Sequence, residues 1–462
     1  MVTNRGDLDC KVAFELVELI IVNCDRRSLL QCSLVCRSWL HSCRPRLFKI
    51  VEIDTSLSAL RFTSLLEGKY ATIPQYIEDL TLKLDIIQRR QFGLAKPIGE
   101  REPENLSFEG VINLIAIRLQ CKIPLLRRLG VVFRGTRMLP RVKIVRETSY
   151  ISRFASTFGH ITELDLHLPA EDKAALIRFT CSFPHLKVLK ARCGVVDDRE
   201  GEEDLEVVQR QAPDWTLPSS LKSLDLSRGL SADLNTDGLN HYYRWLNLQR
   251  PLRLEQLSIY KIEIHARSSD PDIQPYLNKC RELRFLHLGL DTWCVVTTGL
   301  GSVRPYDLSA LEQLEQLVIT IRNVVQDDPD IELVDCTRMM LATLTSPRLQ
   351  RIIFNVSGSG YRTLEEQWDP IDGLLGSDKF KEVMVELVVP FSDLTTGDET
   401  SEEDLLRAKR IFSRCNTQGR ISVVRAPFVV RTRGWNEEGT SEEEDDSEEI
   451  SWVCDRFFQT RF

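Results

Sequence analysis

Apolar positions follow two different patterns along this chain. Near the beginning, residues 12–48 are apolar at helical spacing, with Phe14, Val17 and Ile21 at i, i+3 and i+7. The neighbouring positions of the first helix are also mostly aliphatic, and only two glutamates mark a polar edge. The pattern predicts two or three short helices that carry more apolar surface than their size can bury.

A turn at residues 23–27 separates the first helix from a second apolar segment. Ser28, followed three residues later by Gln31, predicts a capping box at the start of this helix, and Pro45 predicts its end. A segment of about 40 residues rarely buries enough surface to be stable alone. We therefore expect another surface to cover these helices.

From about residue 77 a shorter pattern returns ten times. Each copy has a leucine or other large apolar residue, two further residues, a second aliphatic residue, and then an alternation of apolar and other positions. Seven of the nine intervals between copies fall between 29 and 35 residues, the range of solenoid repeats. The fourth positions of the copies are Leu80, Leu129, Leu164, Leu189, Leu224, Leu257, Leu286, Leu317, Ile352 and Val383.

The alternation with period two predicts a strand in each copy, with one side facing a core. A single copy cannot bury that side, so stacking in parallel with return segments between the strands is predicted. Amphipathic helices are predicted at 170–183, 331–344 and 401–415, and one or two terminal strands at 421–433. An ordinary parallel α/β domain, whose strands happen to begin with leucine, is the alternative.

The segment 12–48 resembles an F-box in three places. VAFEL at 12–16 stands where that family has its opening Leu-Pro-x-Glu-Leu, SLLQCSLVCRSW at 28–39 matches its second block, and RLF at 46–48 matches its closing motif. Ala13 stands where the family usually has proline. The alternative is a small helical cap that packs on the following domain and has no external partner.

The copies from 77 to 390 resemble leucine-rich repeats. They lack the asparagine or cysteine ladder of the usual consensus, because Asp291, Gly229 and Ile262 occupy that position in three copies. The expected fold is therefore α/β, with a short N-terminal helical F-box-like module at 8–50 followed by an irregular leucine-rich-repeat-like solenoid with parallel strands at 51–430. An acidic, largely disordered tail is expected at 431–462.

These resemblances imply a substrate-recognition subunit of a cullin-RING (SCF-type) ubiquitin ligase, which acts in ubiquitin-dependent degradation and catalyses nothing itself. The F-box would dock on a Skp-type adaptor, and through it on a cullin, while the repeats bind an unknown protein substrate. The positions matched to the adaptor contact are Val12, Ala13, Leu16, Ile20, Leu29, Leu34, Val35 and Trp39.

Substrate contacts are expected from side chains that alternate with the strand leucines. Their mixed charges and polar types favour a protein partner over a phosphate backbone. The candidates are Asp165, Lys190, Asp225, Ser258, His287 and Thr320. Two other classes stay open: an interaction scaffold whose F-box-like helices only cap the repeats, and a hydrolase whose nucleophile and base are brought together by folding.

Net charge and cysteine content limit the possible partners and the cellular compartment. The net charge is −8, but residues 437–449 hold nine acidic residues and no base, so the remainder carries +1 and predicts no nucleic-acid partner. Thirteen scattered cysteines predict a reducing compartment, cytoplasmic and/or nuclear. Neither a signal peptide nor a membrane span is expected, since Glu18 interrupts the longest apolar run near the N-terminus.

No catalytic or cofactor motif stands out. GLGSVR at 299–304 has arginine in the place of the third glycine of a dinucleotide loop, so a turn is favoured. Cys32, Cys36 and Cys43 share a helical face but have no second ligand segment, and core packing is favoured over a metal. Polar segments at 90–107 and 197–206 are expected to be loops. Ser441 and Ser447 precede acidic residues, which suggests phosphorylation.

Overall fold

The computed structural model describes residues 14–68, 72–85, 108–119, 122–134, 148–170, 173–195, 215–226, 245–263, 273–291, 305–322, 331–357, 368–390, 406 and 409–426. Several predictions lie outside these residues: the loops at 90–107 and 197–206, the turn at 299–304 and the tail at 431–462. Within these residues, twelve parallel strands follow one another in the sheet in the order of the sequence. The chain divides into two compact units, residues 1–186 and 187–462, and each is described by itself.

Unit 1 begins with three short helices, α1 (Phe14–Asn23), α2 (Arg26–Cys32) and α3 (Arg37–Leu47). The predicted capping box at Ser28 was wrong. Asp25 is the N-cap of α2, because its backbone is extended and its Oδ1 accepts a hydrogen bond from the Ser28 N–H at 2.7 Å. Pro45 does not end the last helix either, since it lies inside the last turn of α3.

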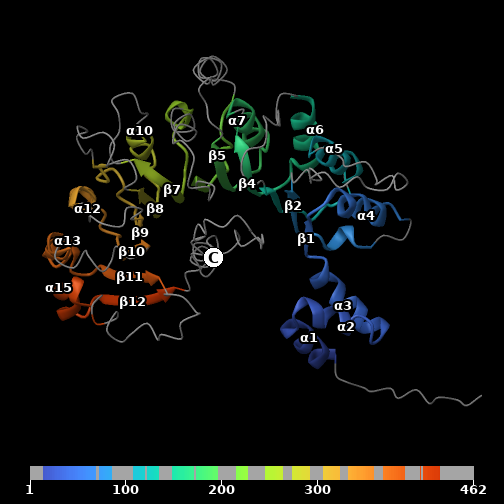
Figure 1. Cartoon of the computed structure of the whole chain (residues 1–462), viewed down its shortest axis with the longest axis horizontal. Coiled ribbons are helices and arrows are strands. Elements are labelled where there is room, and N and C mark those ends of the chain that lie inside the picture. The colour runs from blue at the N-terminus through green and yellow to red at the C-terminus, as the bar shows by residue number, and fades with distance from the viewer. Residues whose placement is uncertain are drawn as a thin grey trace, which may run out of the picture. The chain divides into compact units, whose positions relative to one another are not determined.

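The remainder of unit 1 is a four-stranded parallel sheet with helices between the strands (Figure 1). The first strand was missed by the repeat pattern, although Val51 in it pairs with Leu80 of the first copy. The elements are β1 (Ile50–Ile53), α4 (Ser56–Glu67), η1 (Pro74–Tyr76), β2 (Asp79–Asp85), α5 (Phe108–Leu119), β3 (Arg128–Arg134), α6 (Thr148–Phe158), β4 (Glu163–Ala170) and α7 (Lys173–Cys181).

Unit 2 continues the parallel pattern, and its labelled helices lie on one side of the strands (Figure 1). Its strands are β5 (Val188–Val195), β6 (Ser223–Leu226), β7 (Gln256–Glu263), β8 (Phe285–Asp291), β9 (Gln316–Arg322), β10 (Arg351–Ser357), β11 (Met384–Pro390) and β12 (Ile421–Ala426). Its helices are α10 (Gln274–Leu277), α12 (Ile331–Thr343), α13 (Asp369–Leu375), η4 (Asp378–Phe380) and α15 (Ser413–Thr417).

The strand predictions are confirmed for nine of the ten copies. In unit 2 the fourth positions pair directly from strand to strand, as Leu257, Leu286 and Leu317 do, and they are fully buried. The tenth copy was assigned two residues too early. Val385, and not Val383, pairs with Ile352, because the 3₁₀ turn η4 delays the start of β11 until Met384.

The predicted return segments have mixed outcomes. α7 lies within 170–183 and α12 within 331–344, as expected. Of 401–415 only part is described, and α15 begins near its end. Of the one or two strands expected at 421–433, β12 is described, and the residues after 426 lie outside the described part.

Buried polar groups join the elements at the end of unit 2. The Asp372 carboxylate is fully buried and accepts hydrogen bonds from the backbone N–H groups of Arg414 (2.8 Å) and Cys415 (3.2 Å) at the start of α15. The buried Arg420 guanidinium donates to the carbonyls of Leu375 (2.8 Å) and Val383 (3.0 Å). Buried charges are stable only when they are satisfied in this way.

Candidate functional site

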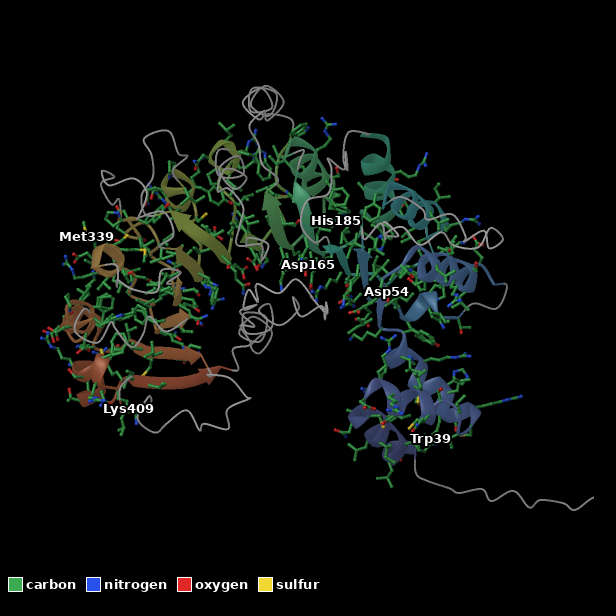
Figure 2. All side chains as sticks on the ribbon, viewed as in Figure 1. Trp39, Asp54, Asp165, His185, Met339 and Lys409 are labelled. Atoms are coloured by element: carbon green, nitrogen blue, oxygen red, sulfur yellow. The ribbon has the colours of Figure 1, made fainter. Side chains whose placement is uncertain are left out.

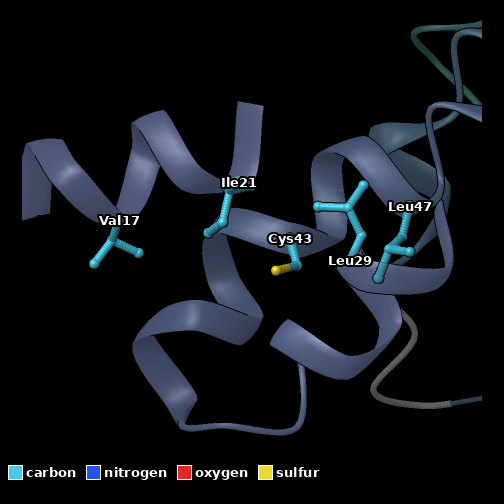
Figure 3. Close-up of a cluster of buried hydrophobic side chains, with 5 residues drawn as sticks. All are labelled: Val17, Ile21, Leu29, Cys43 and Leu47. Atoms are coloured by element: carbon cyan, nitrogen blue, oxygen red, sulfur yellow. The ribbon is translucent and has the colours of Figure 1, made fainter. Parts of the chain in front are cut away.

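The helices α1–α3, with the adjoining Phe48, form what we call the helical module, and it has a core of its own. Five side chains are buried at its centre (Figure 3): Val17, Ile21, Leu29, Cys43 and Leu47. Cys24, Cys32, Trp39 and Phe48 are partly buried against them. Because all members of this cluster lie between residues 17 and 48, the three helices are held together by contacts among themselves.

A large apolar surface remains exposed on the module. Of the sixteen large apolar side chains that are exposed in the described part of the chain, seven lie within the twenty residues 16–35. Leu34 is 85% exposed and Leu16 is 53% exposed. We call this set the exposed apolar surface: Leu16, Leu19, Ile20, Val22, Leu30, Leu34 and Val35.

The sequence of α1 explains why this surface forms. Val17 and Ile21 share the face that packs in the core, whereas Leu16 and Ile20 lie one position earlier on the helix and face away from it. Burying the remaining area of a half-exposed leucine, isoleucine or valine stabilises a complex by about 1 kcal/mol, before the costs of association. The seven side chains therefore offer a binding energy of several kcal/mol to a partner that covers them.

The predicted adaptor contacts divide into three groups. Leu16, Ile20, Leu34 and Val35 lie on the exposed apolar surface. Trp39 (labelled in Figure 2) is partly buried against the core, and Leu29 lies in the core at 6% exposure. Leu29 therefore packs in the core beneath the exposed apolar surface and does not belong to that surface. Val12 and Ala13 lie outside the described residues.

Three exposed residues were not among the predicted contacts: Leu19, Val22 and Leu30. For the first two, the signal was present in the sequence, because α1 is aliphatic around most of its circumference. For Leu30 the signal in the sequence was ambiguous. Leu29 and Leu30 are adjacent in α2, and the spacing alone did not decide which of the two turns inward.

The cysteines of the module are not joined by disulfide bonds in the structure. Cys24 Sγ and Cys32 Sγ lie 4.0 Å apart, and Cys43 is buried. Cys36 is exposed at the N-cap of α3, where hydrogen bonds from the Ser38 hydroxyl and then from the Trp39 backbone lower the pKa of its thiol. No group of three or more potential metal ligands occurs among the residues that the structure describes.

The predicted substrate contacts lie on the face of the strands that alternates with the buried leucines, which we call the alternate face. Asp165 (labelled in Figure 2) and Lys190 are partly exposed there. Asp225, Ser258, His287 and Thr320 are buried, contrary to the expectation that such side chains are available on the surface. Their role in substrate binding stays a prediction.

Hydrogen bonds between strands satisfy three of these buried side chains. Ser258 Oγ lies 3.3 Å from His287 Nδ1, and His287 Nε2 lies 2.8 Å from Thr320 Oγ1. The three polar groups satisfy one another across β7, β8 and β9. A serine and a histidine are thus in contact, as a hydrolase requires, but they are only 1% and 2% exposed and the second imidazole nitrogen meets a hydroxyl instead of a carboxylate.

The alternate face of unit 1 is charged. Arg128 Nη2 contacts Asp165 Oδ2 at 3.1 Å and Arg128 Nη1 contacts Asp79 Oδ2 at 3.6 Å, while His167 Nε2 lies 3.3 Å from Asp165 Oδ1. Burial raises the pKa of Asp79, against the opposing effect of Arg128. Lys83 and Glu52 form a further pair at 2.9 Å. These charges pair mainly with one another, so their net attraction for a charged partner is small.

Within the described residues, no helix has both the length and the apolar character that crossing a lipid bilayer requires. A comparison with protein-family models and a comparison with curated proteins each gave no match to this chain.

Proposed function

We propose that this protein is a substrate receptor of a cullin-RING ubiquitin ligase of the SCF type. The helical module docks on a Skp-type adaptor through its exposed apolar surface, and the strand repeats hold a protein substrate. The chain itself catalyses no reaction. It brings a bound protein close to a conjugating enzyme carried by the same complex.

The observation that carries this proposal is the exposed apolar surface on a module that already has its own core. A helix pair that only caps a domain turns its apolar side inward and a polar side to solvent. Here seven aliphatic side chains remain outside, although the five core residues are buried. Contiguous exposed apolar patches on a folded domain usually mark interaction sites.

The strand repeats support the second half of the proposal. Parallel strands in sequence order, with the repeated aliphatic residues in direct register, are what a leucine-rich-repeat-like solenoid requires. Such arrays present one strand face to partners over several repeats. Of the predicted contact residues, Asp165 and Lys190 are partly exposed.

The experiment is a pull-down of a recombinant Skp-type adaptor with the full chain. The double variant Leu16→Asp, Val35→Asp places two charges on the exposed apolar surface and should abolish co-purification, because burying an unpaired carboxylate in an apolar contact is costly. Both side chains are exposed, so the fold should persist, as circular dichroism will report. Leu65→Asp is the matched control, since Leu65 is equally exposed on α4 outside the module.

Adaptor bound by the parent chain and by Leu65→Asp but lost with the double variant supports the proposal. Adaptor retained by the folded double variant, or no adaptor bound by the parent chain, contradicts it. The second result would favour a scaffold in which the helical module serves the chain alone.

A further inference from the structure

Basic residues are concentrated in the part of the helical module that follows α1. Residues 26–51, which include α2 and α3, contain six basic residues and no acidic residue. The two helices contact each other (Figure 1). This part of the module is therefore strongly basic, although the chain as a whole is acidic.

Most of these basic side chains are exposed and have no acidic partner. Lys49 pairs with Glu78 at 3.4 Å, and Arg44 Nη1 donates a hydrogen bond to Thr72 Oγ1 at 3.2 Å. The other four are exposed and form no ion pair with any residue that the structure describes: Arg26, Arg27, Arg37 and Arg46.

Three of the four lie beside the exposed apolar surface. Arg26 and Arg27 precede Leu30 by four and three residues in α2, so the three side chains share one face of that helix. Arg37 follows Val35 by two residues and is the first residue of α3. We call this set the arginine rim: Arg26, Arg27 and Arg37.

The arginine rim occupies positions at which a cation is unfavourable for the helix. Arg26 and Arg27 are the first two residues of α2, Arg37 begins α3, and neither helix has an acidic residue in its first turn. The N-terminus of a helix carries a partial positive charge, which favours anionic side chains and disfavours cationic ones. The rim therefore does not stabilise its own helices, and departures of this kind from a local rule are expected at functional sites.

We propose that the arginine rim contacts carboxylates on the docking face of the adaptor, so that this face has an apolar centre edged by acidic side chains. The inference rests on the proposed function and adds to it the chemistry of the partner's surface. Arginine binds a carboxylate through two parallel N–H groups, so the rim also orients the partner.

The two parts of the surface have different kinetic roles. Charges at the edge of an interface mainly steer the encounter between two proteins. Differences in the packed contacts mainly change the rate of dissociation. The arginine rim therefore sets the rate of association, and the exposed apolar surface sets the lifetime of the complex.

Other anionic partners match this combination less well. A nucleic acid attracts arginines through its phosphates, but its interfaces are polar and would leave the seven aliphatic side chains uncovered. An anionic bilayer would bury aliphatic side chains, but it would repel Glu15 and Glu18, which lie in α1 together with four of them. An acidic protein surface with an apolar centre suits both features.

The test measures the two rate constants of adaptor binding by biolayer interferometry, with the full chain and a recombinant Skp-type adaptor. The triple variant Arg26→Glu, Arg27→Glu, Arg37→Glu should associate at least about tenfold more slowly, because it replaces attraction by repulsion. Its dissociation rate should change by less than about threefold. The variant should also fold and melt at no lower temperature, since glutamate is favoured at these helix N-termini.

Salt and a charge-matched control separate the rim from the net charge of the chain. The difference in association rate should nearly vanish between about 0.01 M and about 1 M NaCl, as the Debye length falls from about 30 Å to about 3 Å. Arg46 comes about two and a half turns after Arg37, on the opposite side of α3. The control Arg46→Glu, Arg61→Glu, Arg153→Glu changes the net charge equally at exposed arginines outside the rim, and it should associate within about threefold of the parent chain.

Slow association of the triple variant, with the control unaffected, supports the proposal. If the folded triple variant associates as fast as the parent chain, or if the control slows equally, the proposal is overturned and the proposed function stands. No adaptor bound by the parent chain overturns both. Binding of the parent chain to phosphatidylserine vesicles, lost in a triple variant that still associates normally with the adaptor, overturns the proposal and assigns the rim to a membrane surface.

Discussion

The helical module and the strands of unit 2 use the same aliphatic residues with opposite results. In the strands, Leu257, Leu286 and Leu317 occupy paired positions on neighbouring strands and are fully buried. In the module, Leu16 and Leu34 remain open to solvent. The difference lies in the neighbours. Each strand has an equivalent strand beside it, whereas the module's outer helix faces have no equivalent to pack against.

The comparison shows that the solvent exposure of a leucine depends more on whether it lies in a structural repeat than on its residue type. A repeat supplies its own covering surface, so a leucine in it needs no partner molecule. A short unrepeated helical segment can bury one face of each helix and leaves the others open. An apolar surface of this second kind is the better indicator of an external partner.

The largest expected effect contrasts a repeat leucine with a module leucine. Leu286→Ala should lower the free energy of unfolding by about 3 kcal/mol, because it leaves a cavity in a fully buried site. Leu34→Ala should change it by less than about 0.5 kcal/mol, since the side chain is mostly exposed. Urea unfolding followed by circular dichroism measures both. Similar losses in the two variants would remove the contrast between the regions.

A second pair applies the same test within α1. Ile21→Ala should destabilise the helical module by about 2 kcal/mol, since Ile21 is fully buried at its centre. Ile20→Ala, at the adjacent exposed position, is the matched control and should have little effect. Hydrogen exchange of residues 14–47 reports the module separately from the strands. Faster exchange in both variants would mean that Ile20 also contributes to the core.

The third prediction concerns close packing on the alternate face of unit 1. A Cβ added at Gly130 would lie 2.9 Å from Thr81 Oγ1 and 3.1 Å from Thr81 Cγ2. Gly130→Ala should therefore cost about 1 kcal/mol of stability through overpacking. Adding Thr81→Ala should recover most of that loss, because it removes both atoms. Additive losses in the double variant, measured by urea unfolding, would show that the two side chains do not clash.

The smallest expected effect is the pH dependence of the α2 cap. Hydrogen bonds from Ser28, from its side chain first and its backbone second, lower the pKa of Asp25. The stability that the ionised cap gives is present above the ordinary carboxyl pKa and is lost as the pH falls through the lowered value. Asp25→Asn keeps an acceptor but does not titrate, so this acid-induced loss of the module's melting temperature should disappear. An unchanged acid profile in Asp25→Asn would assign the loss to other groups.

Local spacing was enough to locate most strands, because alternation and the repeat interval are both properties of the sequence alone. It failed at the two ends of the array. The segment FKIVEI at 48–53 fits the pattern, but Phe48 is also the last residue of the RLF motif, and β1 was missed. At β11 the 3₁₀ turn that ends at Phe380 moved the strand start by two residues. Asp25 and Ser28 are both good cap residues, and only the backbone geometry decides between them.

The candidate site was foreseen less completely than the fold. That α1 and α2 carry excess apolar surface followed from their composition. Which residue of the Leu29 and Leu30 pair turns inward depends on packing against α3. Ser258, His287 and Thr320 can be satisfied while buried because they bond to one another, and residues about 30 positions apart become neighbours only through the register of the sheet.

The order of the strands in unit 2 has a consequence for how this architecture can change. From β6 to β11 each strand pairs with the strand before it and the strand after it in the chain. If one repeat were added or removed, only the strands beside it would change their pairing partners. All other strand pairs would stay as they are. The sheet can therefore lengthen or shorten by whole repeats, and its width would change in steps of one strand.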